Sequence, residues 1–203
     1  EIGVRLVGSE MCIRDRNITV NGVTYAAQII GFDHDTLTTA DGSRTKAGIT
    51  FQLVDCLKTT YSMNGSNTNV NGWRGSTMRT STMATLLNQL SSDLKSVLKF
   101  VNKVTSVGNS SSGLETTSDK LFLLSEIEVF GATQYSYAGE GKQYEYYTAG
   151  NSTIKKVNGS ANYWWERSPR SGNTNGFCNV GSNGNASSYG ASNSGGVSFG
   201  FCV

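Results

Sequence analysis

The segment from Ser171 to Val203 constrains the fold most, because it contains no charged residue and consists largely of Gly, Ser and Asn. By composition alone, such a segment is typical of a flexible linker. It also carries apolar residues at short intervals, which a linker does not need: Phe177, Val180, Ala186, Ala191, Val197, Phe199, Phe201 and Val203. We therefore expect strands that enter a hydrophobic core and expose small polar residues between the apolar ones.

The whole chain has the composition of a folded protein with many turns. Of its 203 residues, 37% are hydrophobic, 24 are Gly and one is Pro. Charged residues make up 16% and the net charge is +2 without a basic cluster, so we do not expect a nucleic-acid partner. No apolar run is long enough to span a bilayer, so we expect no membrane insertion by this domain.

Residues 6–16, LVGSEMCIRDR, resemble the in-frame translation of a sequencing adapter. We therefore expect residues 1–16 to be non-native and any natural leader or preceding domain to be missing. The remaining residues, 17–203, are long enough for one sizeable domain.

The first half of this domain predicts strands followed by helix. Residues 17–32 predict two strands around an Asn21–Gly22 turn, and residues 48–57 predict a third. Apolar residues then recur at helical steps: Met83, Leu86, Leu87, Leu90, Leu94, Val97, Leu98 and Val101. Residues 91–93 can act as an N-cap, so one helix and two consecutive helices remain alternatives.

After the helices, short elements alternate with polar segments. Residues 106–118 predict a loop, 121–124 a buried strand, 125–128 a capped helical turn and 154–159 a strand with a turn. Together the pattern predicts an α+β fold, with a mixed, mostly antiparallel sheet and one or two helices over residues 76–99 packed on it.

Residues that could carry chemistry are few. The four cysteines, Cys12, Cys56, Cys178 and Cys202, form no CxxC pair, which argues against a zinc or thioredoxin-like site. Cys178 and Cys202 could form a disulfide between neighbouring strands, but free, buried thiols are the preferred interpretation.

Residues 33–35, Asp-His-Asp, are interpreted as a polar turn, because a lone His without a nucleophile partner is weak support for catalysis. A calcium cage needs several converging acidic residues, and the C-terminal third has only Glu140, Glu145 and Glu166. We therefore expect no catalytic residue, metal or cofactor.

Three stretches together resemble a bacterial and phage domain family of otherwise unknown function. They are residues 72–79, DKLFLLSEIEVFG at 119–131 and WWERSP at 164–169. The family usually reads WWLRSP at the last site and closes on a GVRPAF-like strand. Here residues 196–201 read GVSFGF, so no role of the family's closing arginine is transferred.

The resemblance extends over nearly everything from Asn17 onward. It implies a C-type-lectin-like fold related to the formylglycine-generating-enzyme architecture. It also implies a variable protein, since some members carry C-terminal regions diversified by a retroelement that mutates template adenines. That process turns Asn codons into codons for Ser, Gly, Tyr and others, never into a stop. Residues 173–195 match this outcome, so we expect a variable region at about 170–196.

The residue types of this segment independently favour recognition. Tyr gives amphipathic contact area at low entropic cost, and Ser, Gly and Asn adapt their hydrogen bonding, as in antibody paratopes. We expect a ligand-binding surface formed by Arg170, Gly172, Asn173, Asn175, Gly181, Asn183, Ser187, Ser188, Tyr189, Gly190, Ser192, Asn193, Ser194 and Gly195. Tyr189 should be its most energetic contact.

Trp164, Trp165 and Arg167 are interpreted as structural. Adjacent strand residues face opposite sides, so both indoles cannot form one ligand platform. Arg167 is expected to pair with a buried carboxylate or with carbonyls near Pro169.

The expected function is binding of a protein or glycan on a target cell surface, by a protein of a phage virion or bacterial cell surface. Two alternatives stay open. One is a non-variable structural or adhesion module of a phage tail or surface protein, with glycine-rich turns that bind nothing. The other is a formylglycine-generating-type oxidase, which needs reactive paired cysteines, although the residues around Cys178 and Cys202 do not resemble its motifs.

Overall fold

The first and last strands of the described chain belong to the same antiparallel sheet. The computed structural model describes residues 16–203. Five strands pair in the order β1-β2-β5-β14-β8, with bounds β1 (Arg16–Val20), β2 (Val23–Phe32), β5 (Ile49–Leu53), β14 (Gly200–Cys202) and β8 (Leu121–Phe122). Asn21 and Gly22 both adopt positive φ, at 48° and 76°, so the predicted Asn-Gly turn between β1 and β2 is confirmed.

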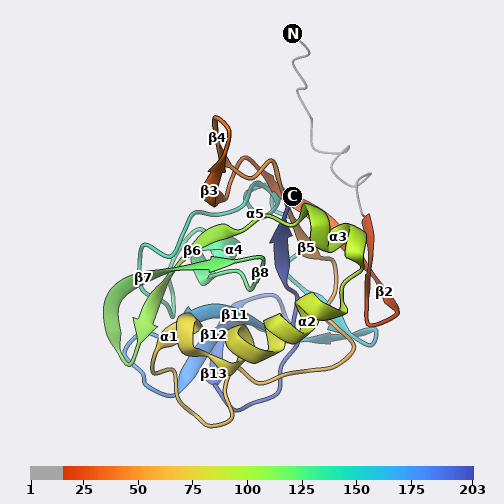
Figure 1. Cartoon of the computed structure of the whole chain (residues 1–203). Coiled ribbons are helices and arrows are strands. Elements are labelled where there is room, and N and C mark those ends of the chain that lie inside the picture. The colour runs from red at the N-terminus through yellow and green to blue at the C-terminus, as the bar shows by residue number, and fades with distance from the viewer. Residues whose placement is uncertain (1–15) are drawn as a thin grey trace.

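Three smaller sheets complete the strand framework, and every pairing between named strands is antiparallel. One has the order β4-β3-β6-β7, with β3 (Thr36–Asp41), β4 (Arg44–Lys46), β6 (Val101–Gly108) and β7 (Ser111–Asp119). A second, in the order β11-β12-β13, contains β11 (Trp164–Pro169), β12 (Gly176–Val180) and β13 (Ala186–Gly190). The third pairs β9 (Lys155–Val157) with β10 (Ser160–Asn162). The β3–β4 hairpin and the β12–β13 hairpin lie at opposite ends of the molecule (Figure 1).

The prediction of a loop over residues 106–118 is wrong, because this segment belongs to the β6–β7 hairpin. Asn109 and Ser110 adopt positive φ, at 54° and 59°, and close the turn. Most of β7 is solvent-exposed and lacks apolar alternation, so its sequence of Ser, Gly and Thr looks like a loop.

The helices are short and mostly lie between β5 and β6. They are α1 (Gly72–Gly75), the π-helix η2 (Met78–Met83), α2 (Ala84–Gln89), α3 (Ser92–Val97), α4 (Glu126–Phe130) and α5 (Glu145–Thr148). Of the two alternatives, consecutive helices are confirmed, because Leu90 is extended and Ser91 caps α3 by accepting from the Leu94 amide. Val101 was assigned wrongly to the helical stripe, since it begins β6. No helix among residues 16–203 has both the length and the apolar character needed to cross a membrane.

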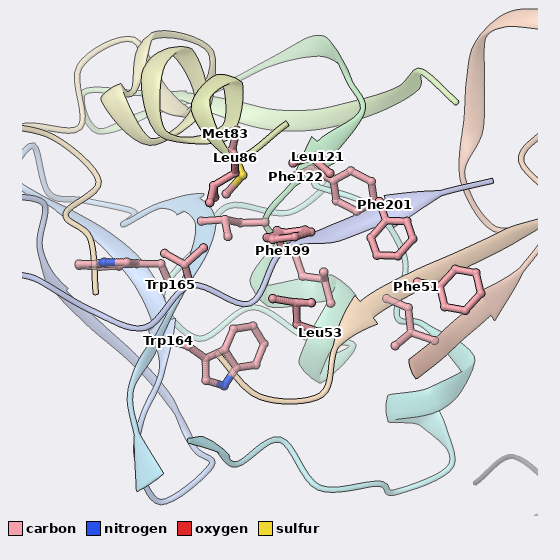
Figure 2. Close-up of a cluster of buried hydrophobic side chains, with 14 of the residues drawn as sticks. Phe51, Leu53, Met83, Leu86, Leu121, Phe122, Trp164, Trp165, Phe199 and Phe201 are labelled. Atoms are coloured by element: carbon pink, nitrogen blue, oxygen red, sulfur yellow. The ribbon is translucent and has the colours of Figure 1, made fainter. Parts of the chain in front are cut away.

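The apolar residues of the last segment enter the core as expected. Phe177, Val180, Ala191, Val197, Phe199 and Phe201 are buried, whereas Ala186 and Val203 are half-buried. Figure 2 shows Phe199 and Phe201 among Leu53, Phe122 and the side chains of Met83 and Leu86 that extend from the helix.

The two adjacent tryptophans are packing residues. Trp164 and Trp165 are fully buried, and Figure 2 shows their indoles directed to different parts of the core. Each indole N–H has a carbonyl acceptor, Thr153 at 2.9 Å and Tyr61 at 2.8 Å. The expected structural role is confirmed.

A buried charge network joins the sheets. Arg167 of β11 donates two hydrogen bonds to Glu128 of α4, which confirms the expected carboxylate partner. The carbonyls that Arg167 reaches belong to Val104, Leu123 and Glu140 rather than to residues near Pro169. Burial alone would raise the pKa of Glu128, but the Arg167 and Lys103 cations lower it.

The predicted capped turn at residues 125–128 is also confirmed, and it fixes Glu128 in place. The Ser125 hydroxyl accepts from the Glu128 amide while the Glu128 carboxylate accepts from the Ser125 amide. The Glu128 carboxylate therefore takes part in the N-terminal cap of α4 and also accepts the two hydrogen bonds from Arg167.

Replacing Arg167 should destabilise the fold far more than replacing an exposed arginine. Arg167→Met leaves the buried Glu128 with one cation fewer, so we expect a loss of about 3–5 kcal/mol in the free energy of unfolding. Arg44→Gln, which replaces an exposed arginine of β4, is the matched control and should cost about 1 kcal/mol or less. Urea unfolding measures both, and equal losses would contradict the central role of the Arg167–Glu128 pair.

Candidate ligand-binding surface

The β12–β13 hairpin separates a buried strand from an exposed one. All five residues of β12 are buried, whereas β13 lies at the edge of its sheet and is half-exposed. Phe177 pairs with Tyr189 and Asn179 pairs with Ser187 across the two strands. Because paired residues of an antiparallel ladder point to the same face, the buried side chains of β12 support the exposed side chains of β13.

A broad hollow of the surface borders β13. This first hollow has a volume of about 920 Å³. Ser187 and Tyr189 contribute from β13, Gly181 and Asn183 from the hairpin turn, and Tyr163 from the residues before β11. Residues 132–134 line it further, with Phe130 and Glu126 of α4. Most side chains around this hollow are uncharged and carry hydroxyl or amide groups.

A second hollow of about 320 Å³ adjoins the other part of β13. Its lining contains the predicted residues Arg170, Asn173, Asn175, Ser188, Gly190 and Asn193. Tyr189 lines both hollows, and 48% of it is exposed. The Tyr189 ring lies 4.7 Å from the Tyr163 ring, centroid to centroid. Partial burial raises the pKa of Tyr163, and the neighbouring Tyr189 adds to that rise.

The other predicted residues line neither hollow. Gly172, Ser192 and Ser194 are exposed. The Ser192 hydroxyl donates to Asn67 at 2.8 Å, and the Ser194 hydroxyl is 2.7 Å from that of Thr60.

The prediction for Gly195 is wrong, because this residue is buried. Its backbone pairs with Tyr61, and a Cβ at this position would overlap the Tyr163 ring and approach the Trp165 indole nitrogen to 2.8 Å. Glycine is therefore required here for close packing rather than for recognition.

The loops around the hollows are held by asparagine side chains. Buried Asn69 donates from its amide to the carbonyls of Asn173 at 2.9 Å and Gly176 at 2.8 Å. The Asn173 side chain accepts from the Asn175 and Gly176 amides, and the Asn183 side chain accepts from the Asn185 amide. These are Asx turns, so Asn173 and Asn183 shape the loops as well as border the hollows.

Sequence reasoning missed several residues that line the same hollows. Tyr163 and Asn185 border the first hollow and Asn67 borders the second. Asn185 lies within the polar run and could have been included on composition. Tyr163 and Asn67 come from other parts of the chain, and only the three-dimensional arrangement brings them to Tyr189.

Two acidic side chains beside this surface, Glu126 and Glu166, are buried. Glu126 accepts hydrogen bonds from the amides of Gln134, Tyr135 and Ser136, so it holds the loop beside the first hollow. Glu166 is fully buried and its oxygens have no hydrogen-bond partner among the described residues. Burial raises the pKa of Glu166 well above its usual range, and Glu126 and Glu140 raise it further. Arg170 is the cationic side chain in the lining of the second hollow.

The cysteines do not form a reactive pair. Cys56, Cys178 and Cys202 are free and buried, with Cys178 in β12 and Cys202 in β14, which belong to different sheets. Burial raises the thiol pKa of both Cys178 and Cys202. Cys12 lies outside the described residues, as do most of residues 6–16, whose resemblance to an adapter stays a prediction. Accessible thiolates, which an oxidase would need, are therefore not provided by Cys178 and Cys202.

Residues 33–35 form more than a polar turn. Asp33 has φ 45°, typical of a turn, and His34 stacks on Tyr144 with centroids 4.0 Å apart. Asp35 is buried and joins the charge network through Lys103, a role that sequence reasoning missed. Residues 16–203 hold no group of three or more His, Cys, Asp or Glu side chains arranged to bind a metal ion.

The fold and the surface define a β-rich α+β protein with a polar, largely uncharged face on the edge of a small sheet. Residues 47–203 match the family described as Domain of unknown function (DUF6273), and the chain belongs to this family. Neither a curated protein nor a solved structure shows significant similarity to the chain.

Removing the Ser187 and Tyr189 side chains from the edge strand β13 should leave stability nearly unchanged. We expect the double variant Ser187→Ala, Tyr189→Ala to change the free energy of unfolding by no more than about 1 kcal/mol. Phe177→Ala, in the paired strand, should cost about 3–5 kcal/mol because it leaves a core cavity. Thermal and urea unfolding measure both variants, and a large loss in the first would show that Ser187 and Tyr189 are core residues.

Proposed function

We propose that this protein binds a ligand reversibly and without covalent chemistry, through the polar face formed by the two hollows along β13. The observation that carries the proposal is the division between β12 and β13. Buried residues of β12 hold the hairpin, while Tyr189 and the small polar residues around it stay accessible along the edge strand.

The chemistry of the face supports recognition rather than catalysis. Two tyrosines in contact give a broad amphipathic area, and hydroxyl and amide groups surround them. Such surfaces bind through aromatic contacts and adaptable hydrogen bonds, as paratopes do. A rigid scaffold below polar loops is also where binding sites concentrate.

We further propose that the domain is a C-type-lectin-like variable protein. The sheet that joins β1, β2, β5 and β14 supports this fold, because it contains strands from both ends of the described chain while the small sheet carries the polar loops. The exposed Asn, Ser, Gly and Tyr residues support diversification by adenine mutagenesis, because buried neighbours such as Phe177 and Val180 would stay fixed. The partner would be a protein or glycan on a target cell, and the host molecule a phage virion or bacterial surface protein.

A non-variable structural module is the second candidate. The Asx turns of Asn173 and Asn183 favour it, because they account for two of the asparagines by turn chemistry alone. They do not account for Tyr189, 48% of which is exposed at the sheet edge.

The binding proposal is tested on an array of purified bacterial surface glycans and proteins. The wild-type protein should be retained by at least one class of probe, and Tyr189→Ala should weaken that binding at least about tenfold. Phe100→Ala, an exposed aromatic outside both hollows, is the matched control and should bind as the wild type does. Two results would contradict the proposal. One is an equal loss of binding in both variants, and the other is a wild-type protein that binds none of the glycan or protein probes.

The variable-protein proposal has a separate test in the parent genome. We expect a near-repeat of the coding region that differs only at adenines, next to a reverse transcriptase gene. Its absence would favour the non-variable module.

A further inference from the structure

A lysine amine is held against two carboxylates in the middle of the protein. Lys103 of β6 is 1% exposed. Its Nζ lies 2.6 Å from Oδ1 of Asp35 and 2.9 Å from Oε1 of Glu128. The Phe122 ring covers the amine, with its centroid 4.0 Å from Nζ. The amine is therefore shielded from bulk water while it is in contact with a carboxylate.

The Asp35 carboxylate is surrounded by hydroxyl donors. Its Oδ2 accepts from the Thr50 hydroxyl at 2.6 Å and from the Tyr144 hydroxyl at 3.0 Å. Burial alone would raise the pKa of Asp35, but Lys103 and Thr50 lower it, so the contact begins as an ion pair. The same two hydroxyls can stabilise negative charge that develops on Oδ2 when a nucleophile attacks Cγ.

From this geometry we propose that Lys103 and Asp35 condense into an intramolecular amide cross-link, between Nζ and Cγ, with release of one water. A proton passes from Nζ to Oδ1, which leaves a neutral amine and a carboxylic acid. The nitrogen lone pair then forms the N–C bond, and the C=O electron pair moves onto Oδ2. Glu128 takes the second proton from nitrogen and returns it to the Oδ1 hydroxyl, which leaves as water as the C=O bond re-forms. The ammonium and the carboxylate thus become one amide and one water, and Glu128 is unchanged.

Two physical effects drive this step. Reacting groups held in contact can have effective molarities of about 10⁵–10⁸ M. The buried network also loses one cation and one anion, and with them the desolvation penalty of a buried ion pair. The Arg167–Glu128 pair, fully hydrogen-bonded, remains. Asp35, Glu128 and the exposed Lys142 line a hollow of about 280 Å³, which gives the released water an exit.

The cross-link would join two parts of the chain that the family match separates. Asp35 lies between β2 and β3, before the matched residues 47–203, and Lys103 lies within them. The amide would tie the preceding strands covalently to the family domain. The inference does not rest on the proposed binding function.

Intact-mass spectrometry of the denatured full chain, after incubation of the folded protein to constant mass, tests the cross-link. We expect a mass lower by one water than the sequence requires, and a protease digest with a branched peptide that joins residues around Asp35 to residues around Lys103. The branched peptide is essential, because Asp41–Gly42 can also lose water by forming a succinimide.

Lys103→Arg is the matched variant, since it keeps the charge but removes the amine nucleophile. It should show no branched peptide and a lower thermal midpoint than the cross-linked protein. Wild-type protein held in urea should not cross-link either, because the reaction needs the folded contact. Full mass after incubation, or water loss confined to residues 41–42, would overturn the proposal whether or not the Lys103→Arg variant folds.

Discussion

The buried contact between Arg167 and Glu128 is the constraint on which the arrangement depends. Arg167 belongs to β11, the buried edge strand of the sheet that carries the polar face, and Glu128 belongs to the capping box of α4. Two buried charges without each other would be costly to hold in the core. The pair therefore fixes β11 against α4, and Glu126 of the same helix fixes the loop beside the first hollow.

Across the small sheet, burial decreases only at the edge strand β13. β11 is buried, β12 is buried, and β13 is a half-exposed edge. Asn69 and the Asx turns then hold the loops at either end of the hairpin. Tyr189 lies in the edge strand, where its side chain contacts both the packed sheet and solvent. A surface of this kind can change its side chains while the core keeps its packing, which is what a diversified binding protein would require.

Local signals in the sequence predicted local structure well. The Asn21–Gly22 turn, the capping box at Ser125 and the buried apolar residues of the last segment all follow from short-range chemistry. The β6–β7 hairpin was missed because the exposed face of β7 needs no apolar residue.

The remaining errors concern contacts between residues far apart in the chain. The burial of Gly195 depends on Tyr163 and Trp165, the contribution of Asn67 depends on the packing of its loop against residues 190–192, and the role of Asp35 depends on Lys103. The spacing of apolar and polar residues along a single sequence does not predict contacts between such distant residues.

The central claim, a fixed frame below a replaceable face, is tested most directly by two randomised libraries. One randomises Ser187, Ser188, Tyr189 and Asn193, and the other randomises Phe177, Val180, Ala191 and Phe199. The measurement is the fraction of variants in each library that resist proteolysis as folded protein. We expect most variants of the first library and few of the second to fold. A similar collapse in both libraries would contradict the claim, because the face would then belong to the core.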